Sequence, residues 1–520
     1  MTHSVRREES VATTNDNDSA AMSRDRVKYQ PLKSRSSKPW IVAHSLFSNT
    51  FIRKWGILCI VLCFLLGFLF YQRVLYQEYI YHTLPLFQRS VKLELAMGKE
   101  PVQPDRWKPI GDPSLRYQMF SAYFDPRLEI VEGLPTSNGR LPVGSVRIFA
   151  VLPLKIRQME VFCHFRYAEG EVVRQRADLV EAIHENFEML FSATSVVCKL
   201  TGDKSQLKIQ LPYEVGLSYN FEPSMIDATS FVQIHYPRGN LLLRMNPSRD
   251  LAVCVGPVHS NYSNAARIVE FVEYWRLLGA ERFYLYNKSV TEDVSRVLGH
   301  YRDRGIAEVL EWNLEGYKFE QELRYEGIFA ALNECLYRST LVGDFHFTAM
   351  VDLDEFLLPL ESAFDGENLV QFLHRRNRFD VHSFNFPAVF FYGFYEEDFS
   401  RVPRGANNTY LYTQVRNLRT KEPLIHHNRS KYVASGRTVI EAGNHFVWRA
   451  LRDTKELRIT EKEGLLFHYR DRCVGYGCET FVEDGRARRY ERQIWRAVEG
   501  TCRQIFPQYG GQCPLGKEND

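Results

Sequence analysis

Hydrophobic residues recur with two different periods along the chain, and the period changes near residue 251. Before that point, apolar and polar residues alternate in short runs, at residues 143–154, 159–167, 205–211 and 230–236. Alternation with a period of two predicts half-buried strands, because successive side chains of a strand point to opposite faces. We therefore expect a β-rich accessory region over residues 117–250.

From residue 251 onward, short apolar runs alternate with segments of helical spacing. Residues 264–280 place apolar side chains at helical intervals and end at Gly279, and residues 291–305 and 319–340 predict two more helices. The segments predicted as strands are residues 251–258, 282–287, 306–312 and 345–360. This alternation predicts an α/β domain over residues 251–500, with a largely parallel sheet covered on both faces. Such sheets bind ligands at the carboxyl ends of their strands.

Residues 55–71 form an apolar run that contains no charged side chain. At about 1.5 Å per residue, continuing to residue 75 gives roughly the 30 Å of a bilayer core. A buried core helix and a cleaved signal peptide are the alternatives, but the run starts late and no A-x-A pattern follows it. We expect a transmembrane signal anchor at residues 55–75.

The residues around this anchor set its orientation and its neighbours. Basic side chains, including Arg53 and Lys54, crowd the N-terminal flank, which predicts a cytosolic tail and a lumenal body, a single-pass type II layout. Residues 1–54 have the composition of a disordered tail. The proline-rich residues 76–116 suit a stem, and residues 501–520 form a C-terminal tail. We expect a Golgi membrane protein; a short span suits thin early membranes, so the endoplasmic reticulum stays open.

Composition and cysteine content agree with this layout without proving it. The net charge of +3 is too small to indicate a nucleic-acid partner. The eight cysteines outside the apolar run suit disulfides in an oxidising compartment, although eight reduced thiols give the same count. Pairing of Cys163 with Cys198, and pairing within the C-terminal group, are hypotheses. N-glycosylation tripeptides begin at Asn261, Asn287, Asn407 and Asn428.

The candidate chemistry lies where an apolar segment runs into acids. Asp352, Asp354 and Glu355 follow residues 345–351. On a continuous strand, Asp352 and Asp354 would lie on the same side, where two close carboxylates need a cation or a shared proton. Oxygen ligands suit Mg²⁺ or Mn²⁺, which also bind substrate phosphates. A solvated strand end is the alternative, since a D-x-D tripeptide alone is a weak signal.

At this point the chain resembles glycosyltransferase family 92, over about residues 117–475. The segments that carry the resemblance are residues 120–127; 266–273, 278–279 and 283–286; 326–327 and 334–336; 352–356 with Pro359; and Lys431, Val439, Glu441, Gly443 and His445 with residues 468–470. One departure is Ile328, where the family pattern has a glutamine, which puts the sugar specificity in doubt. The tail after Gly475 has no clear counterpart.

The resemblance implies a GT-A-type (Rossmann-like) fold, a UDP-sugar donor, Mn²⁺ (or Mg²⁺) and inversion at the anomeric carbon. Characterised members are similar in adding β-linked galactose to glycan acceptors, including a fucose on the N-glycan core. Carried over to this chain, Asp352, Asp354 and His468 would hold the metal. Lys431 and His445 would lie near the diphosphate or the acceptor.

An inverting transfer needs a base that takes the proton of the acceptor hydroxyl. Glu441 is the favoured candidate and Glu355 the second, with Asp380, Glu396 and Glu397 also open. Arg267 either binds the donor or pairs with Glu270, three residues further along the same helix.

Three function classes stay open at this stage. The favoured one is a galactosyltransferase with a glycan or glycoprotein acceptor; transfer of another sugar is its rival. A non-catalytic, lectin-like lumenal protein with a GT-A fold would have no need of a diphosphate metal. A glycosidase would hold its two acids roughly 5–10 Å apart across a cleft instead of two residues apart.

Overall fold

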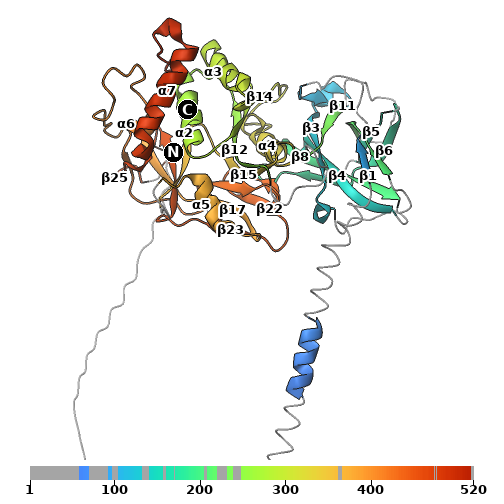
Figure 1. Ribbon diagram of the computed structural model, residues 1–520. Helices are drawn as coiled ribbons and strands as arrows, with labels where there is room; N and C mark the ends of the chain where they lie inside the picture. Colours follow the sequence, from blue (N-terminus) through green and yellow to red (C-terminus); the bar gives the residue numbers. More distant parts are fainter. Residues whose placement is uncertain are drawn as a thin grey trace, which may run out of the picture. The chain divides into compact units, whose positions relative to one another are not determined.

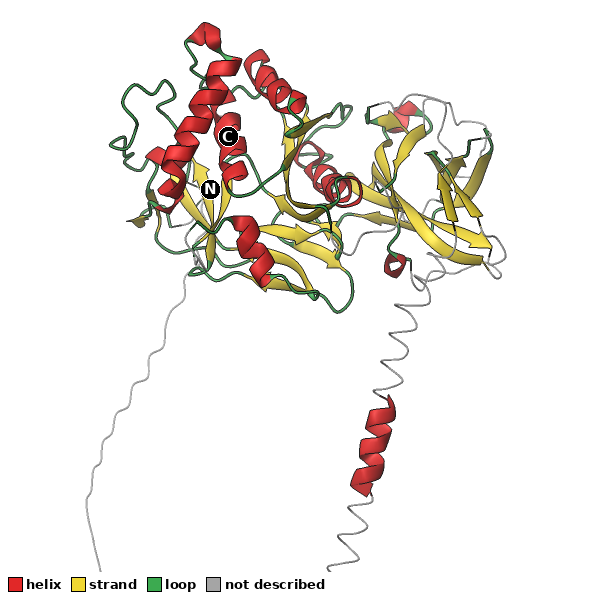
Figure 2. Ribbon diagram, viewed as in Figure 1, coloured by secondary structure: helices red, strands yellow, loops and turns green. Residues whose placement is uncertain are grey.

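The computed structural model describes the following residues: 58–69, 92–95, 104–131, 140–155, 160–168, 170–203, 208–219, 231–237, 247–360, 366–473, 475 and 477–516. The chain divides into two units, Met1–Leu84 and Pro85–Asp520. Figures 1 and 2 show the second unit as a strand-rich part joined to a part with both helices and strands.

In the first unit, residues 58–69 form a helix with exposed side chains. Cys59 and Cys63 on this helix are free thiols. Within the described residues, no helix has the length and apolar character needed to cross a membrane. The predicted tail at residues 1–54 and the flanks of the predicted anchor, residues 55–57 and 70–75, lie outside the described part. The signal anchor therefore stays a prediction.

The β-rich part of the second unit is built around a nine-stranded sheet of the described residues. The strand order is β6-β5-β10-β11-β3-β4-β8-β7, with β2 paired to β3. The disulfide between Cys163 in β5 and Cys198 in β8 joins strands that are far apart in this order. The sheet must therefore fold over on itself, and side chains from both layers fill the space between them. The strands are β2 (Lys108–Pro109), β3 (Gln118–Asp125), β4 (Arg140–Pro153), β5 (Val161–Arg166), β6 (Val172–Arg176), β7 (Leu179–Ala182), β8 (Phe191–Asp203), β10 (Glu214–Tyr219) and β11 (Phe231–His235). Strand β1 (Lys92–Leu95), within the predicted stem, pairs in parallel with β9 (Lys208–Leu211).

The second sheet has the order β14-β13-β12-β15-β20-β17-β23. Its first four strands are parallel, whereas β20 is antiparallel to both of its neighbours, so the sheet is mixed where a largely parallel one was predicted. The strands are β12 (Arg249–Val258), β13 (Arg282–Asn287), β14 (Ala307–Glu311), β15 (Phe345–Met350), β17 (Val381–Phe386), β20 (Lys431–Ser435) and β23 (Lys455–Arg458).

The order of the four parallel strands locates the site. Taken in chain order, they lie third-second-first-fourth, so the direction of winding reverses between β12 and β15. Ligands of open α/β sheets bind at the carboxyl ends of the strands at such a reversal. The acidic residues after β15 lie at this point.

Helices cover both faces of the second sheet, as the alternating pattern predicts. On β12, Leu251 and Val253 face the apolar core shared with α2, α3 and α7, whereas Ala252 faces the core shared with α4. The helices are α2 (Ala265–Leu277), α3 (Glu292–Asp303), α4 (Ile328–Tyr337), α5 (Leu369–Arg376), α6 (Tyr412–Val415) and α7 (Glu491–Ile505). The remaining strands are β16 (Glu355–Pro359), β18 (Ala388–Tyr392) and β24 (Gly464–Arg470) in one small sheet, and the pairs β19 (Leu418–Thr420) with β25 (Phe481–Glu483) and β21 (Val439–Ala442) with β22 (Val447–Ala450).

The predicted helix at residues 319–340 is wrong over its first half. The α-helix begins only at Ile328, because Tyr325, Glu326 and Gly327 all have left-handed backbone angles. Tertiary contacts hold this segment: Lys288 pairs with Glu326, whose carbonyl accepts the indole N–H of Trp312 at 2.8 Å. These contacts outweigh the helical propensity of the sequence.

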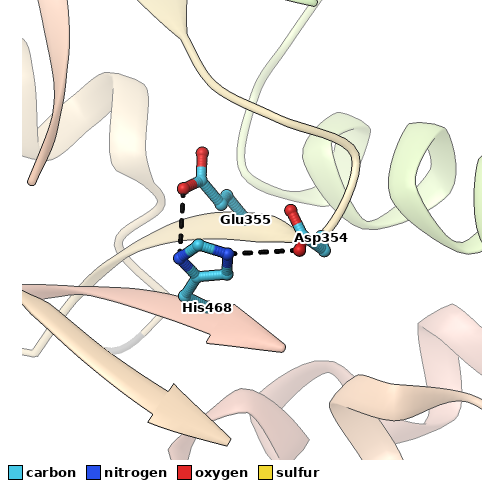
Figure 3. Close-up of side chains that lie close together, drawn as sticks. All are labelled: Asp354, Glu355 and His468. Atoms are coloured by element: carbon cyan, nitrogen blue, oxygen red, sulfur yellow. Dashed lines mark hydrogen bonds and ion pairs between the residues drawn. The ribbon is translucent and has the colours of Figure 1, made fainter. Parts of the chain in front are cut away.

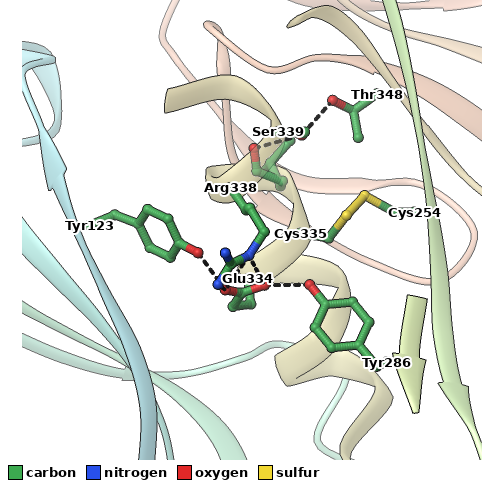
Figure 4. Close-up of a disulfide and its surroundings, with 9 residues drawn as sticks. Tyr123, Cys254, Tyr286, Glu334, Cys335, Arg338, Ser339 and Thr348 are labelled. Atoms are coloured by element: carbon green, nitrogen blue, oxygen red, sulfur yellow. Dashed lines mark hydrogen bonds and ion pairs between the residues drawn. A yellow bond between two sulfur atoms is a disulfide. The ribbon is translucent and has the colours of Figure 1, made fainter. Parts of the chain in front are cut away.

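Helix α4 ties the two sheets together through a buried carboxylate (Figure 4). Glu334 accepts hydrogen bonds from the hydroxyl groups of Tyr123 in β3 and Tyr286 in β13, and Arg338, directly after the end of α4, lies 2.6 Å from it. A disulfide joins Cys335 of α4 to Cys254 of β12. The other disulfides are Cys473–Cys478 and Cys502–Cys513, so the hypotheses for the cysteine pairs are confirmed.

Candidate functional site

The two aspartates of the D-x-D sequence lie in a turn between β15 and β16, where a continuous strand was predicted. The backbone N–H of Asp352 donates to the carboxylate of Glu355 at 2.8 Å, and the N–H of Glu355 donates to the carbonyl of Asp352 at 3.2 Å. These two local hydrogen bonds close the turn. As a result, Asp352 and Asp354 do not share one face of a strand and have different partners.

Asp354, Glu355 and His468 form a compact group at the carboxyl end of β15 (Figure 3). Pairing of β16 with β24 sets Glu355 opposite His468. His468 Nε2 lies 3.1 Å from Asp354 Oδ2, and His468 Nδ1 lies 3.2 Å from Glu355 Oε1. The Glu355 and His468 side chains are buried, whereas that of Asp354 is 32% exposed. The group therefore opens to solvent on the side of Asp354.

Burial and neighbouring charges act against each other in this group. Burial raises the pKa of Glu355, and the positive charges of Lys431 and His468 only partly offset this effect. Burial would also raise the pKa of Asp354, but the charge of His468 and its hydrogen bond lower it instead. Burial would lower the pKa of His468, and the two carboxylates raise it. Electrostatic attraction thus holds the imidazole of His468 between the carboxylates of Asp354 and Glu355.

Lys431, predicted near the diphosphate, reaches the same turn from β20. Its Nζ lies 2.9 Å from Asp352 Oδ2, 3.4 Å from Glu355 Oε2 and 2.8 Å from Asn444 Oδ1. The side chain is 2% exposed, and although burial would lower its pKa, the two carboxylates raise it. Lys431 therefore offsets the repulsion among the three acids. Asp352 lies with Lys431, and Asp354 lies with His468.

His445 and Asn444 belong to the loop that joins β21 to β22. His445 Nδ1 lies 3.0 Å from the carbonyl of Ser430, and burial together with the charge of Lys431 lowers the pKa of His445 to about 4. A neutral ring that donates from Nδ1 keeps Nε2 as an acceptor. The ring of His445 is therefore neutral near pH 7 in this structure. Asn444 was not predicted, because its contact with Lys431 depends on a hairpin that the spacing alone does not show.

Arg267 and Glu441 have partners outside the group of Asp354, Glu355 and His468. Arg267 is 3% exposed and pairs with Glu270 at 2.9 Å, the alternative to donor binding that the sequence left open. Burial raises the pKa of Asp354, and the charge of Arg267 helps to lower it, by less than His468 and Arg470 do. Glu441 pairs with Arg449 at 3.1 Å and with the ring of His184, from the β-rich part, at 2.8 Å.

The chemistry of the donor set fits a divalent cation. Among the described residues, Asp354, Glu355 and His468 can each offer a ligand atom, all within 4.8 Å of one another. His468 Nδ1 is buried without a well-aligned hydrogen bond. Carboxylate oxygens suit Mg²⁺ and Mn²⁺, and an imidazole nitrogen is accepted by many divalent transition metals. Glu355, predicted as a possible base, is thus placed among the candidate ligands.

Ile328, the departure from the family pattern, lies at the start of α4 beside the end of β12. A Cβ added to Gly256 would lie 2.9 Å from Ile328 Cδ1, so the side chain fills the space next to that strand. An apolar group therefore stands where the resemblance implies an amide.

Comparison with known proteins agrees with the family resemblance seen in the sequence. Residues 249–506, about half of the chain, match the model of glycosyltransferase family 92. A beta-1,4-galactosyltransferase of Caenorhabditis elegans is 31% identical over 112 residues, which make up 21% of this chain and 25% of that protein. The chain therefore matches only a quarter of the length of this relative.

Two solved structures of glucosyl-3-phosphoglycerate synthase from Mycobacterium tuberculosis are also similar. The complex with phosphoglyceric acid is 13% identical, with 52% of this chain and 82% of that chain covered and a TM-score of 0.23. The complex with Mn²⁺, uridine diphosphate and glucosyl-3-phosphoglycerate is 11% identical with the same coverage and a TM-score of 0.21. At these TM-scores the two structures carry no argument about the present site.

Proposed function

The chain belongs to glycosyltransferase family 92, and on this premise we propose that it is a metal-dependent, inverting galactosyltransferase. In this proposal it has a GT-A-type fold and moves galactose from UDP-galactose onto a glycan acceptor, such as fucose on an N-glycan core. The name of the Caenorhabditis elegans relative supports galactose as the sugar. Ile328 is the reason to test other UDP-sugars beside it.

One observation carries the proposal. Asp354, Glu355 and His468 lie together at the carboxyl end of β15, where the parallel strand order reverses. This is the edge at which an open α/β sheet binds its ligand. The solvent-exposed side of Asp354 gives a diphosphate access to a cation held there.

Each residue of the site has a defined task in this proposal. Asp354, Glu355 and His468 hold Mn²⁺ or Mg²⁺, which when bound acts as a Lewis acid toward the departing diphosphate. Lys431 keeps the turn in place by binding Asp352 and Glu355 at once. Asp352, whose side chain is 44% exposed, faces solvent next to this position. The role of Glu441 as the base stays a prediction.

We also propose that the chain is a type II protein of the Golgi membrane with its catalytic part in the lumen. The apolar residues 55–71 and their basic flank support this orientation. Four disulfides among the described residues suit an oxidising compartment. Glycans on Asn407 or Asn428 of protein made in cells, detected by glycosidase digestion, would support a lumenal location, and their absence together with reduced cysteines would contradict it.

The decisive experiment is a donor screen with the full-length chain, purified in detergent. Release of UDP from a panel of UDP-sugars is followed with Mn²⁺ and a pool of mixed N-glycans, with and without a chelator. We expect release from UDP-galactose that the chelator abolishes. Release from another UDP-sugar alone would reject galactose and keep the transferase.

A matched pair of variants makes this screen specific for the site. Asp354→Asn should lose the release of UDP, whereas Asp453→Asn should keep it, since Asp453 lies on an exposed turn with a left-handed backbone that asparagine also accepts. If folded wild-type protein releases no UDP from any donor, a lectin-like protein becomes the better explanation. Calorimetry with UDP and Mn²⁺ then shows whether a donor site exists at all.

A further inference from the structure

Four aromatic side chains form a continuous row beside the candidate site. His427 stacks on Phe446 with ring centroids 4.3 Å apart, Phe446 lies 4.8 Å from Trp448, and Trp448 stacks on His184 at 5.2 Å with an angle of 9° between the planes. We call these four residues the ring row. Trp448 is 37% exposed and the His184 side chain is 48% exposed, so both rings are partly open to solvent.

The ring row comes from two parts of the chain that are far apart in sequence. Trp448 and Phe446 belong to the β21–β22 hairpin of the α/β part, and His184 belongs to the loop between β7 and β8 of the β-rich part. Glu441 accepts both the backbone N–H and the ring N–H of His184, each at 2.8 Å, and thereby holds this ring against Trp448. Glu441, whose role as the base stays a prediction, thus also positions a ring of the row.

A chain of hydrogen bonds links the row to the acids of the site. The indole N–H of Trp448 donates to Glu185 at 3.2 Å, and the same carboxylate oxygen accepts the backbone N–H of Asn444 at 2.7 Å. The side chain of Asn444 in turn accepts from Lys431, which binds Asp352. Glu185, Asn444 and Lys431 therefore connect the ring row to Asp352 at the proposed donor site.

The close packing at this junction depends on a glycine. A Cβ added to Gly443 would lie 2.6 Å from Trp448 Cδ1 and 2.7 Å from Glu185 Oε2, closer than real Cβ atoms come to such neighbours. The hairpin thus brings its backbone directly under the indole and the carboxylate. Trp448 is held in place by the fold and is not a loose surface side chain.

The chemistry of the row points to a neutral, hydroxyl-rich ligand. Aromatic rings pack against the C–H face of a sugar ring, and tryptophan offers the largest such surface with little loss of conformational entropy. Carboxylates flank the row: Glu185 lies beside Trp448 at 3.2 Å, and Glu456, which also pairs with Arg458 at 3.0 Å, lies 2.8 Å from His427. Carboxylates accept hydrogen bonds from sugar hydroxyls and repel phosphate groups. A nucleotide is therefore disfavoured here, and a neutral glycan is favoured.

From these contacts we propose that the ring row, together with Glu185, is the subsite that binds the acceptor glycan. A sugar ring of the acceptor stacks on Trp448, and its hydroxyl groups donate to Glu185. The proposal rests on the transferase function proposed above and adds the surface that selects the acceptor. It also gives the β-rich part a task, because His184 and Glu185 come from that part.

The test measures glycan binding separately from catalysis. Full-length protein in detergent is passed over an immobilised pool of mixed N-glycans, and its UDP affinity is measured with Mn²⁺ by calorimetry. Trp448→Ala should weaken glycan binding roughly 10- to 30-fold, the usual loss when a buried aromatic anchor is truncated. Trp448→Phe should recover part of this loss, because a smaller ring still stacks. UDP affinity should stay the same in both variants.

A control variant and two outcomes make the test decisive. Phe379→Ala removes a side chain that is 97% exposed and should leave glycan binding unchanged. Wild-type glycan affinity in Trp448→Ala, or no glycan binding by the wild-type protein, would overturn the proposal. Equal loss of UDP and glycan binding would also overturn it, because the residue would then support the whole site. Failure of UDP release with intact, Trp448-dependent glycan binding would reject only the transferase function.

Discussion

Two clusters of charged side chains lie in the same unit of this protein and differ in how far their acids are exposed to solvent. The closed cluster consists of Glu334, Arg338, Asp105, Tyr123 and Tyr286, and the open cluster consists of Asp352, Asp354, Glu355, Lys431 and His468. Both combine acids with basic side chains that bridge them. In the closed cluster, the side chains of Glu334, Arg338 and Asp105 are all at most 7% exposed. In the open cluster, Asp352 is 44% exposed and Asp354 is 32% exposed.

The supply of neutral donors explains this difference. Glu334 receives hydrogen bonds from the hydroxyl groups of Ser121, Tyr123 and Tyr286 in addition to Arg338, so its carboxylate is saturated inside the protein. A buried carboxylate that is saturated in this way joins structural elements and has no place for a ligand. The carboxylates of Asp352 and Asp354 keep a side toward solvent. Charge content alone thus does not separate a structural cluster from a candidate site; saturation and access do.

The largest expected effect is the loss of activity in Asp354→Asn. Removing one cation ligand should lower the rate of UDP release by roughly 10³-fold, which is about 4 kcal/mol of transition-state stabilisation. The free energy of unfolding should fall by only about 1–2 kcal/mol, because the variant loses the charge that pairs with His468 at a residue that is partly exposed. Steady-state rates and urea unfolding of the same preparation measure both quantities. A loss of stability as large as the loss of activity would erase the distinction between the clusters.

The opposite pattern is expected for Arg338→Met. The change leaves Glu334 and Asp105 without their shared cation in a buried setting, which should cost about 3–5 kcal/mol of unfolding free energy. The remaining folded protein should keep its UDP affinity. Urea unfolding followed by tryptophan fluorescence measures the loss.

Two further variants show whether the buried charge is the cause. Arg302→Met, at a side chain that is 62% exposed, should change the stability by less than about 0.5 kcal/mol. Arg338→Met combined with Glu334→Gln should regain part of the lost stability, because the unpaired carboxylate is gone. If the double variant is less stable than Arg338→Met alone, the arginine stabilises the fold mainly through the packing of its side chain.

Addition of Mn²⁺ should separate the clusters by a smaller effect. A ligand that binds only the folded protein stabilises it by about 2.7 kcal/mol at a concentration of 100 times its Kd. We expect this rise in thermal stability for the wild-type chain and for Arg338→Met, and none for Asp354→Asn. Thermal unfolding at increasing Mn²⁺ concentration measures it. The same rise in Asp354→Asn would place the cation elsewhere.

The sequence predicts the elements of the α/β part better than it predicts their local detail. Helical spacing and apolar runs locate α2, α3, β13 and β14, since each of these elements is held by a buried face that leaves its period in the sequence. The first half of the segment at residues 319–340 escapes this reasoning, because Lys288 and Trp312, distant in sequence, hold Glu326 in a non-helical backbone. The curvature of the β-rich sheet depends likewise on strand pairing that no local pattern contains.

The candidate site, too, is only partly predictable from the sequence. A run of acids after an apolar strand indicates the edge of the sheet at which Asp354 lies. It does not show that Asp352 turns to Lys431 while Glu355 joins His468, because these contacts arise from the pairing of β16 with β24 and from the place of β20. Asn444, Glu185 and Trp448 leave no motif in the sequence; only the fold brings their loops together.

The smallest effect is a dependence of stability on pH that comes from the closed cluster. Burial alone would raise the pKa of Asp105, but the charges and hydrogen bonds of His235 and Arg338 outweigh it and hold this pKa well below its ordinary value. In the unfolded chain the pKa returns to about 3.9. A carboxyl whose pKa is lower in the folded state contributes stability above the unfolded value and loses that contribution as the pH falls toward the folded value. The wild-type chain should therefore lose stability below about pH 4.

Asp105→Asn should be less stable by about 1–3 kcal/mol at pH 7, where the charged hydrogen bonds are lost, and should show a shallower decline between about pH 5 and pH 2. Urea unfolding at several pH values measures both effects, with Asp303→Asn, at an exposed side chain, as the control. An equally steep decline in Asp105→Asn would assign the acid sensitivity to other carboxylates and remove Asp105 from the set that holds the closed cluster together.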